Sequence, residues 1–127
     1  MPIIGTGVDI VDTARITKLM GNHPERFLER CFTKSEQEDS KSTKRNHEHL
    51  AARFAAKEAA LKALGTGWAQ GIGWTDIEVV KEQSGKPMLK ISGRAAEIAS
   101  ELGIRSWHLS LSHITTHAIA MVIAESD

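Results

Sequence analysis

Three charged residues, Asp9, Glu58 and Lys62, are of types that suit the binding of a metal ion and phosphate groups. Asp9 lies inside a run rich in isoleucine and valine, residues 3–11. Glu58 and Lys62 lie one helical turn apart in a segment rich in alanine, leucine, lysine and glutamate, residues 48–64. Mg²⁺ takes one or two protein carboxylates and completes its shell with water and substrate phosphates, while lysine neutralises phosphate charge. Asp9 and Glu58 therefore predict a hard-cation site with Lys62 beside it.

Each of these residues also has a simpler interpretation. Glu58 and Lys62 could form an ordinary (i, i+4) ion pair, which stabilises a helix by about 0.3 kcal/mol. Asp9 could point to the solvent side of its strand, because alternate residues of a strand face opposite ways. The charge distribution along residues 48–64 bears on this choice.

The predicted helix 48–64 carries charge beside its apolar stripe instead of opposite to it. At roughly 100° per residue, the stripe consists of Leu50, Phe54, Leu61 and Leu64. Lys57 falls inside the stripe, Arg53 lies at one edge and Glu58 near the other, while the opposite side is mostly alanine. Charges in such a place need partners, because a desolvated unpaired charge is costly. The pattern predicts close packing on both sides and charges that line an internal or intersubunit cleft.

The composition predicts one globular domain, residues 1–127, without the bulk charge of a nucleic-acid or membrane binder. The 16 basic and 16 acidic side chains give a net charge of zero, whereas such binders gain affinity from excess positive charge. Cys31 is the single cysteine, so it forms no internal disulfide, suits a reducing compartment and is interpreted as structural. The N-terminal sequence resembles no signal peptide, and no apolar run reaches the ~20 residues that span a bilayer. We expect a cytoplasmic protein.

Periodicity and capping signals predict an α+β fold in which an antiparallel sheet packs against one long helix, with short helices around it. Expected strands cover residues 3–11, 77–80, 88–91, 107–112 and 116–123, and expected helices cover 13–20, 24–30, 48–64 and 93–102. Thr33 and Glu36 form a capping box that should start one more short helix. Residues 39–47 are polar and unpatterned and are predicted to be a surface loop.

Other candidate motifs fail because of their context. His113 and His117 have the spacing of a helical zinc motif, but the sequence around them predicts strands. The glycine-rich stretch 65–73 follows its helix, whereas a phosphate-binding loop precedes one. Ser112 and His113 are adjacent in a strand and would point to opposite faces, which disfavours a nucleophile and base pair.

Three segments of the chain resemble the motifs of a known family. The segments are Gly5-Thr6-Gly7-Val8-Asp9-Ile10-Val11 with Arg15-Ile16, Arg53-Phe54-Ala55-Ala56-Lys57-Glu58-Ala59 continuing to Gly67, and the closing His108-Leu109-Ser110-Leu111-Ser112-His113. They are similar to bacterial holo-acyl-carrier-protein synthases, the short members of the 4'-phosphopantetheinyl transferase superfamily. The resemblance covers essentially the full length. One departure is His117, where an aromatic residue such as tyrosine is expected.

The resemblance implies an enzyme that transfers 4'-phosphopantetheine from coenzyme A to a serine of apo acyl carrier protein and releases 3',5'-ADP, in support of fatty acid biosynthesis. The catalytic residues would be Asp9, Glu58, Lys62 and His108. Asp9 and Glu58 would hold Mg²⁺, and Lys62 would contact a phosphate oxygen. Water bound to Glu58 or to the metal is the preferred acceptor of the serine proton, and His108 is the second candidate.

The resemblance also implies binding surfaces for both substrates and assembly of the chain into a homotrimer with sites between subunits. The coenzyme A site would comprise Lys44, Arg45, Arg53, Lys62, Gly65 and His108. The acidic carrier protein would dock on Arg15 and Lys18 of the first helix and on Arg26 of the next. The alternatives are a non-catalytic adaptor that recognises a carrier domain, and another Mg²⁺-dependent nucleotide enzyme.

Overall fold

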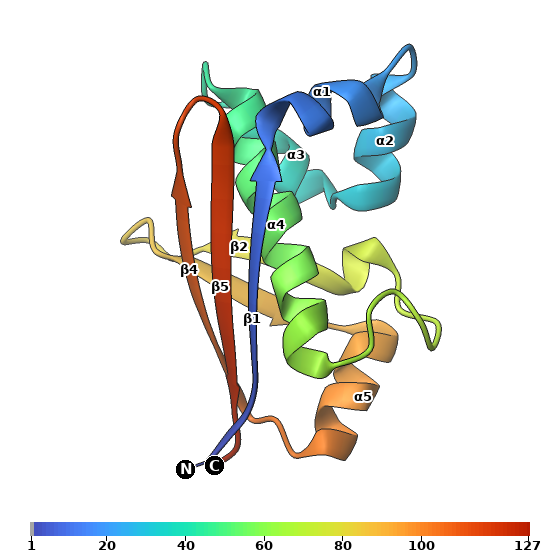
Figure 1. The fold of residues 1–127 in the computed structure, drawn as a ribbon, viewed down its shortest axis with the longest axis vertical. Helices are drawn as coiled ribbons and strands as arrows, with labels where there is room; N and C mark the ends of the chain where they lie inside the picture. Colours follow the sequence, from blue (N-terminus) through green and yellow to red (C-terminus); the bar gives the residue numbers. More distant parts are fainter. Residues whose placement is uncertain (1) are drawn as a thin grey trace.

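The computed structural model describes residues 2–127, and it shows a three-stranded sheet lying along one side of a long helix, with short helices and a hairpin around that helix (Figure 1). In chain order the elements are β1 (Ile3–Asp12), α1 (Thr13–Met20), α2 (Pro24–Cys31), α3 (Lys34–Lys41), α4 (Asn46–Leu64), the 3₁₀ helix η1 (Trp74–Asp76), β2 (Ile77–Lys81), β3 (Pro87–Ile91), α5 (Gly93–Leu102), β4 (Ser106–His113) and β5 (His117–Glu125). All strand pairs are antiparallel. The predicted α+β class is confirmed.

The strands form two sheets, which the sequence pattern alone did not predict. The larger sheet has the order β1-β5-β4, so β1 lies at its edge, and the hairpin β2-β3 forms the second sheet. Periodicity identifies strands but not their partners, and the larger sheet joins the first strand of the chain to the last. Across the helices of residues 2–127, length and hydropathy fall short of what a bilayer span requires.

Glycines in β1 let the edge strand approach α4 closely. A Cβ atom on Gly7 would lie 1.8 Å from the carbonyl oxygen of Ala59, and one on Gly5 would lie 2.0 Å from that of Ala63. Because faces alternate along a strand, Asp9 points toward α4 together with Gly5 and Gly7. The neighbouring Val8 points to the other face of the sheet and is 53% exposed. The close contact therefore fixes which face of β1 carries Asp9.

Helix α4 is buried on most sides, as its alanine-rich sequence predicts. Ala55 and Ala59 are fully buried, and Phe54 and Leu61 are almost fully buried. The helix ends at Gly65, which adopts the left-handed conformation with φ of 78°. Small side chains allow the sheet to pack against α4 while α1, α3 and β2 contact it elsewhere. A helix in this position can present charged side chains to a cleft without exposing an apolar face.

The predicted loop at residues 39–47 is wrong over part of its length, because α3 continues to Lys41 and α4 begins at Asn46. Its polar residues are anchored by specific contacts that a hydropathy pattern does not reveal. The buried Ser40 hydroxyl donates to the Gln37 carbonyl at 2.7 Å, and the buried Glu48 carboxylate lies 2.8 Å from His113 Nδ1. Only residues 42–45 connect the two helices.

Candidate functional site

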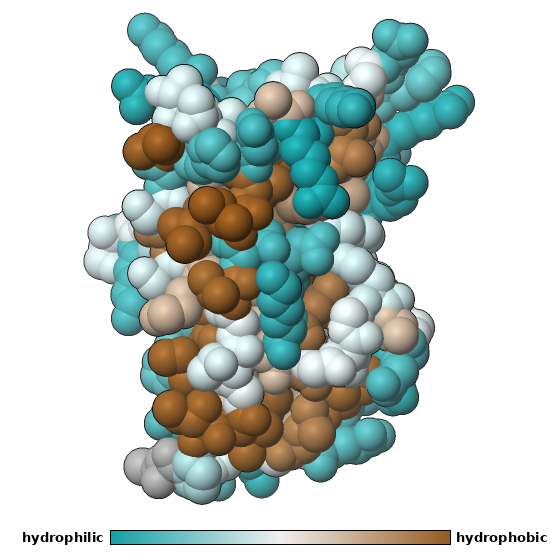
Figure 2. Space-filling view, in the orientation of Figure 1, coloured by the Kyte–Doolittle hydropathy of each residue, from teal (hydrophilic) through white to brown (hydrophobic). Residues whose placement is uncertain are grey.

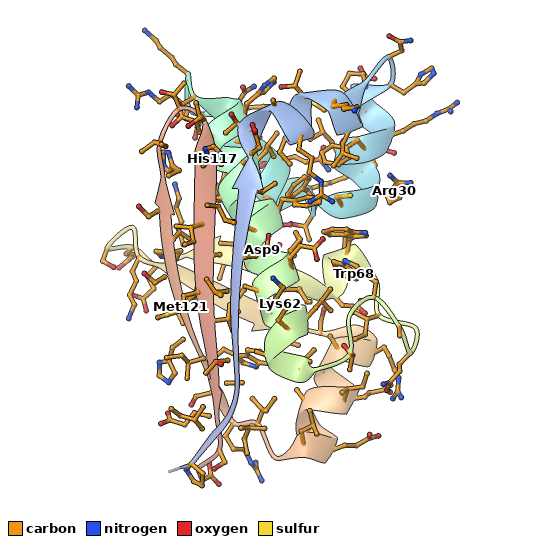
Figure 3. The ribbon with its side chains drawn as sticks, viewed as in Figure 1. Asp9, Arg30, Lys62, Trp68, His117 and Met121 are labelled. Atoms are coloured by element: carbon orange, nitrogen blue, oxygen red, sulfur yellow. The ribbon has the colours of Figure 1, made fainter. Side chains whose placement is uncertain are left out.

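Asp9 and Lys62 meet between the edge strand β1 and helix α4 (Figure 3). The Lys62 ammonium donates to Asp9 Oδ1 at 3.2 Å and to the Val8 carbonyl at 2.8 Å. The edge position of β1 leaves that carbonyl available to a side chain. The Asp9 side chain is 17% exposed, whereas that of Lys62 is 55% exposed. Asp9 is therefore a mostly buried carboxylate whose lysine partner can reach solvent.

Glu58 lies one turn before Lys62 on α4 and is half-buried. Residues four apart lie on the same side of a helix, so Glu58 lies on the side of α4 from which Lys62 reaches Asp9. The Trp68 indole N–H donates to Glu58 Oε1 at 3.4 Å. Among residues 2–127, Lys62 makes its ion pair with Asp9, and Glu58 makes its polar contact with Trp68. The simple (i, i+4) pair is thus not the arrangement found.

The Asp9 and Glu58 carboxylates suit a divalent cation. Asp9 Oδ2 is buried and has no hydrogen-bond partner within the described residues, and a buried polar atom without a partner is costly. Over the same part of the chain, no group of three or more His, Cys, Asp or Glu side chains gathers around a metal position. Two protein carboxylates with substrate phosphates and water match the coordination of Mg²⁺. The donor set fits that ion better than zinc.

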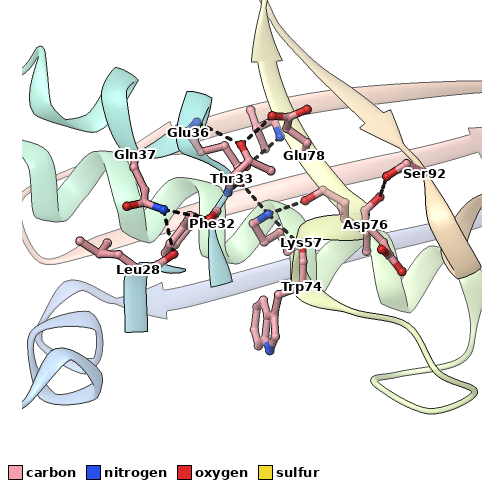
Figure 4. Close-up of polar contacts among 12 residues, drawn as sticks. Leu28, Phe32, Thr33, Glu36, Gln37, Lys57, Trp74, Asp76, Glu78 and Ser92 are labelled. Atoms are coloured by element: carbon pink, nitrogen blue, oxygen red, sulfur yellow. Dashed lines mark hydrogen bonds and ion pairs between the residues drawn. The ribbon is translucent and has the colours of Figure 1, made fainter. Parts of the chain in front are cut away.

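Lys57, the charge inside the apolar stripe, is paired with Glu36 in the core (Figure 4). Its ammonium lies 2.9 Å from Glu36 Oε1 and 3.1 Å from the Trp74 carbonyl, and it also donates to the Ile77 carbonyl. Glu36 Oε2 accepts the Val79 N–H at 2.8 Å. Burial lowers the pKa of Lys57, and the adjacent Glu36 carboxylate opposes this shift. The pair ties α3, α4 and β2 together behind Glu58.

The residues expected to bind the adenosine end of coenzyme A do not meet Asp9 within one chain. Lys44 and Arg45 line a cavity of about 450 Å³ at the start of α4, roughly 20 Å along the helix from Glu58 at 1.5 Å per residue. Arg53 is buried, and its Nε and Nη2 atoms have no partner in residues 2–127. Burial lowers the pKa of Arg53, and Asp39 partly offsets this. Nine residues separate Arg53 from Lys62, which places them on opposite sides of the helix.

Local contacts within the chain engage both His108 and Gly65. His108 is exposed on β4 and points to the sheet face opposite Asp9, where its Nε2 lies 3.0 Å from Glu125 Oε1. This hydrogen bond lowers the pKa of Glu125. The Gly65 N–H donates to the carbonyls of Leu61 and Lys62 at the end of α4. That N–H is therefore not free to bind a phosphate, and Gly65 supplies mainly the left-handed turn.

The expected carrier-docking residues divide between two places on α1 and α2. Arg26 lines a cavity of about 350 Å³ together with Leu19, His23 and Arg30. The Arg15 guanidinium instead lies over the Phe54 ring, 5.3 Å from its centroid. Lys18 is exposed. Arg30, which the sequence analysis did not select, adds a second arginine to the cavity.

Trp68 was also missed, although it contacts a predicted metal ligand. It lies in the irregular segment between Gly65 and η1, where no periodicity indicates the direction of a side chain. The available signal was the position of Trp68 in a glycine-rich turn. A large aromatic residue is unusual in such a turn unless it packs against a partner.

Comparisons with known proteins give the same result from sequence and from structure. The profile of the 4'-phosphopantetheinyl transferase superfamily matches residues 5–122. The chain is 49% identical over 124 residues to the holo-[acyl-carrier-protein] synthase of Trichlorobacter lovleyi, covering 98% of each chain. Two solved synthases superpose on it. That of Neisseria meningitidis has a TM-score of 0.89 and 33% identity, covering 98% of this chain and 100% of the other. That of Bacillus anthracis, in complex with CoA (3',5'-ADP), has a TM-score of 0.80 and 38% identity, covering 98% of each.

Proposed function

Because the chain belongs to the 4'-phosphopantetheinyl transferase superfamily and, within it, to the holo-[acyl-carrier-protein] synthases, we propose that it transfers 4'-phosphopantetheine from coenzyme A to a serine of an apo acyl carrier protein. One observation carries the proposal for the site. Asp9 Oδ2 is buried and has no partner among residues 2–127, and the same carboxylate is paired with Lys62, which follows Glu58 by one turn of α4. This donor set fits Mg²⁺ shared with a pyrophosphate. The solved Bacillus anthracis relative is in complex with CoA (3',5'-ADP).

Asp9 and Glu58 would hold the Mg²⁺ ion, which when bound polarises a phosphate and stabilises the leaving oxygen. Lys62 would turn from the Val8 carbonyl to a phosphate oxygen, a movement open to a side chain that is 55% exposed. Its positive charge compensates the charge that develops during phosphoryl transfer, where catalysis is mostly positioning and electrostatics. Asp9, through the bound ion, and Lys62, through its ammonium group, would thus orient the phosphates.

The serine oxygen of the carrier forms a bond to the phosphorus that bears the pantetheine arm. The bond from that phosphorus to the bridging oxygen breaks, and the electron pair leaves with 3',5'-ADP. The serine proton would pass to a water molecule held by the Glu58 carboxylate, which is half-buried. His108 is the second candidate for this proton, and only a second copy of the chain could deliver it, because it lies on the opposite sheet face.

A homotrimer with shared sites would complete the coenzyme A site. The outward face of the three-stranded sheet carries exposed apolar side chains, which gather over β1 and β5 in Figure 2. They include Val8, Ile10, Ile119 and Met121, which are 41% to 64% exposed. Contiguous exposed apolar patches mark interaction surfaces, and His108 lies on this same face. Neighbouring copies would bring Lys44, Arg45 and His108 to coenzyme A molecules held at Asp9, whereas Arg53 is buried within its own chain.

The acidic carrier protein would dock on α1 and α2. Arg26 and Arg30 flank a cavity that also contains the exposed Leu19, which combines charge attraction with apolar contact. Arg15 and Lys18 lie on the adjoining helix and extend the positive surface. Exposed charges of this kind govern encounter and orientation. The reaction would serve fatty acid biosynthesis in the cytoplasm.

Release of 3',5'-ADP tests the proposal against its alternatives. The purified protein is incubated with coenzyme A, Mg²⁺ and an apo acyl carrier protein, and the nucleotide products are separated by chromatography. We expect 3',5'-ADP only when all three are present. An adaptor would release none, and another nucleotide enzyme would act without coenzyme A or without the carrier. Either result would overturn the proposed function.

A further inference from the structure

We infer that Trp68 is a positioning residue that holds Glu58 in the orientation required to bind the metal ion, an inference that rests on the proposed function. The Trp68 indole N–H donates to Glu58 Oε1 at 3.4 Å, so the contact engages one carboxylate oxygen and leaves the other for a cation. Figure 3 shows Trp68 beside α4, on the side of the helix where Asp9 and Lys62 lie near one another. Partners that hydrogen-bond to a metal ligand fix its orientation and strengthen metal binding.

Ring stacking fixes the direction of the Trp68 indole. Its ring centroid lies 3.8 Å from that of Trp74 at an interplanar angle of 33°. Trp74 in turn stacks on Phe54, with centroids 4.8 Å apart and an angle of 30°. Phe54 is buried on α4, one turn before Glu58. The stack therefore connects Trp68 to the same part of the helix that carries its carboxylate acceptor.

The backbone of the same loop is fixed to α4 at both ends. Gly65 closes the helix, and the Trp74 carbonyl accepts a hydrogen bond from Lys57 at 3.1 Å. Lys57 is adjacent to Glu58 in sequence and is held by Glu36 in the core. Between these ends, Gly67, Gln70 and Gly71 have positive φ angles and turn the chain back toward the helix. Lys57 thus contacts the backbone of Trp74, and the next residue of α4, Glu58, contacts the indole ring of Trp68.

The competing arrangement for Glu58 is an ion pair with Lys62, because opposite charges four residues apart on a helix attract. Trp68 supplies an alternative partner, and within the described residues Lys62 pairs with Asp9. Without the indole N–H, the Glu58 carboxylate would turn toward Lys62. That movement would withdraw both a metal ligand and the phosphate-binding cation from the site.

Two variants separate positioning from packing. Trp68→Phe keeps a stacking ring but removes the N–H donor, and Trp68→Ala removes both. The matched control is Trp107→Phe, because Trp107 is a half-buried tryptophan on β4 that lines a cavity with Ala99 of α5. Binding of Mn²⁺ in the presence of coenzyme A is measured by electron paramagnetic resonance. The Mg²⁺ dependence of transfer and the thermal unfolding midpoint are measured on the same samples.

We expect Trp68→Phe to weaken Mn²⁺ binding about tenfold and to raise the Mg²⁺ concentration for half-maximal transfer in proportion. Its kcat at saturating Mg²⁺ and its unfolding midpoint should stay close to those of the wild type. For Trp107→Phe, Mn²⁺ binding, the Mg²⁺ dependence of transfer and the unfolding midpoint should all stay close to those of the wild type. Mn²⁺ binding by Trp68→Phe equal to that of the wild type would overturn the inference while leaving the proposed function intact. A wild type that does not transfer phosphopantetheine would instead overturn the proposed function.

Discussion

At the scale of single residues, the chemistry depends on one buried carboxylate oxygen. Asp9 Oδ2 has no partner among the described residues, although the other oxygen of the same group contacts Lys62. In the proposed function, a divalent cation and the phosphates of coenzyme A complete this site. The charge of Asp9 and that of Glu58 are then needed together, and an isosteric amide cannot replace either.

Asp9→Asn and Glu58→Gln should each lower turnover by about 100-fold or more, because each removes a ligand charge where the phosphates are held. The fold should be retained, since both changes preserve shape. Turnover at saturating Mg²⁺ and circular dichroism are measured for both variants, with Glu97→Gln as the control because Glu97 is exposed on α5. Turnover within about tenfold of the wild type for both variants would refute the metal assignment.

His49 gives the fold a dependence on pH. Desolvation lowers its pKa from 6.5 to about 4, and the cations Arg53 and Lys81 act in the same direction while Asp39 opposes them. The unfolded chain therefore binds a proton near pH 6.5 that the folded chain excludes until about pH 4. The contribution of His49 to stability is present above pH 6.5 and is lost as the pH falls, by up to about 3 kcal/mol.

The variant His49→Gln should flatten this part of the pH profile. The free energy of unfolding is measured with denaturant at several pH values between the unfolded and the folded pKa of His49, for the wild type and the variant. Groups that titrate in both proteins cancel in the difference. Profiles of equal slope would show that His49 takes up its proton in the folded state.

At the scale of elements, the Glu36–Lys57 pair holds α3, α4 and β2 in register. Both side chains are fully buried, and Glu36 also closes the capping box of α3 through the Thr33 N–H. Removing one partner of a buried ion pair leaves an uncompensated charge and costs about 3–5 kcal/mol. The pair stabilises the region that supports Glu58 and is itself closed off from solvent.

Glu36→Gln should therefore lower the free energy of unfolding by about 3 kcal/mol or more, as measured by denaturant unfolding. Glu97→Gln is the comparison, because its partner Arg94 and Glu97 itself are 37% and 66% exposed. Such exposed pairs contribute about 0–1 kcal/mol. Equal losses for the two variants would mean that Lys57 does not depend on Glu36.

The sequence predicted most elements because their signals are local. The glycines of β1, the alanines of α4 and the Thr33–Glu36 capping box each specify a nearby backbone conformation or a close approach. It also predicted that Lys57 needs a partner, but Glu36 lies 21 residues earlier and only the fold brings it there. Trp68 and the opposite orientations of Asp9 and His108 likewise depend on tertiary packing. The two sheets could not be predicted because strand pairing joins distant segments.

At the scale of the whole molecule, the outward face of the three-stranded sheet remains uncovered in a single chain. Its apolar side chains and the position of His108 support the proposed homotrimer. Met121 is 48% exposed at the centre of this face, on β5, whereas Met88 is 41% exposed on the separate hairpin β2-β3. These two methionines provide a matched pair for testing the assembly.

Met121→Glu should convert the proposed trimer to a monomer and abolish most transfer activity, because a charge at a buried apolar contact is costly. Met88→Glu should change neither property. Light scattering at the concentration used for the activity assay gives the mass of each protein. A wild-type monomer that is fully active would contradict the shared-site assembly.

The most direct test of the central claim is the intact mass of an apo acyl carrier protein after incubation with this protein, coenzyme A and Mg²⁺. The account predicts that the carrier gains the mass of one 4'-phosphopantetheine group. It also predicts no gain when the acceptor serine of the carrier is replaced by alanine, or when Asp9→Asn is used. An unchanged mass of the wild-type carrier with the wild-type protein would contradict the account.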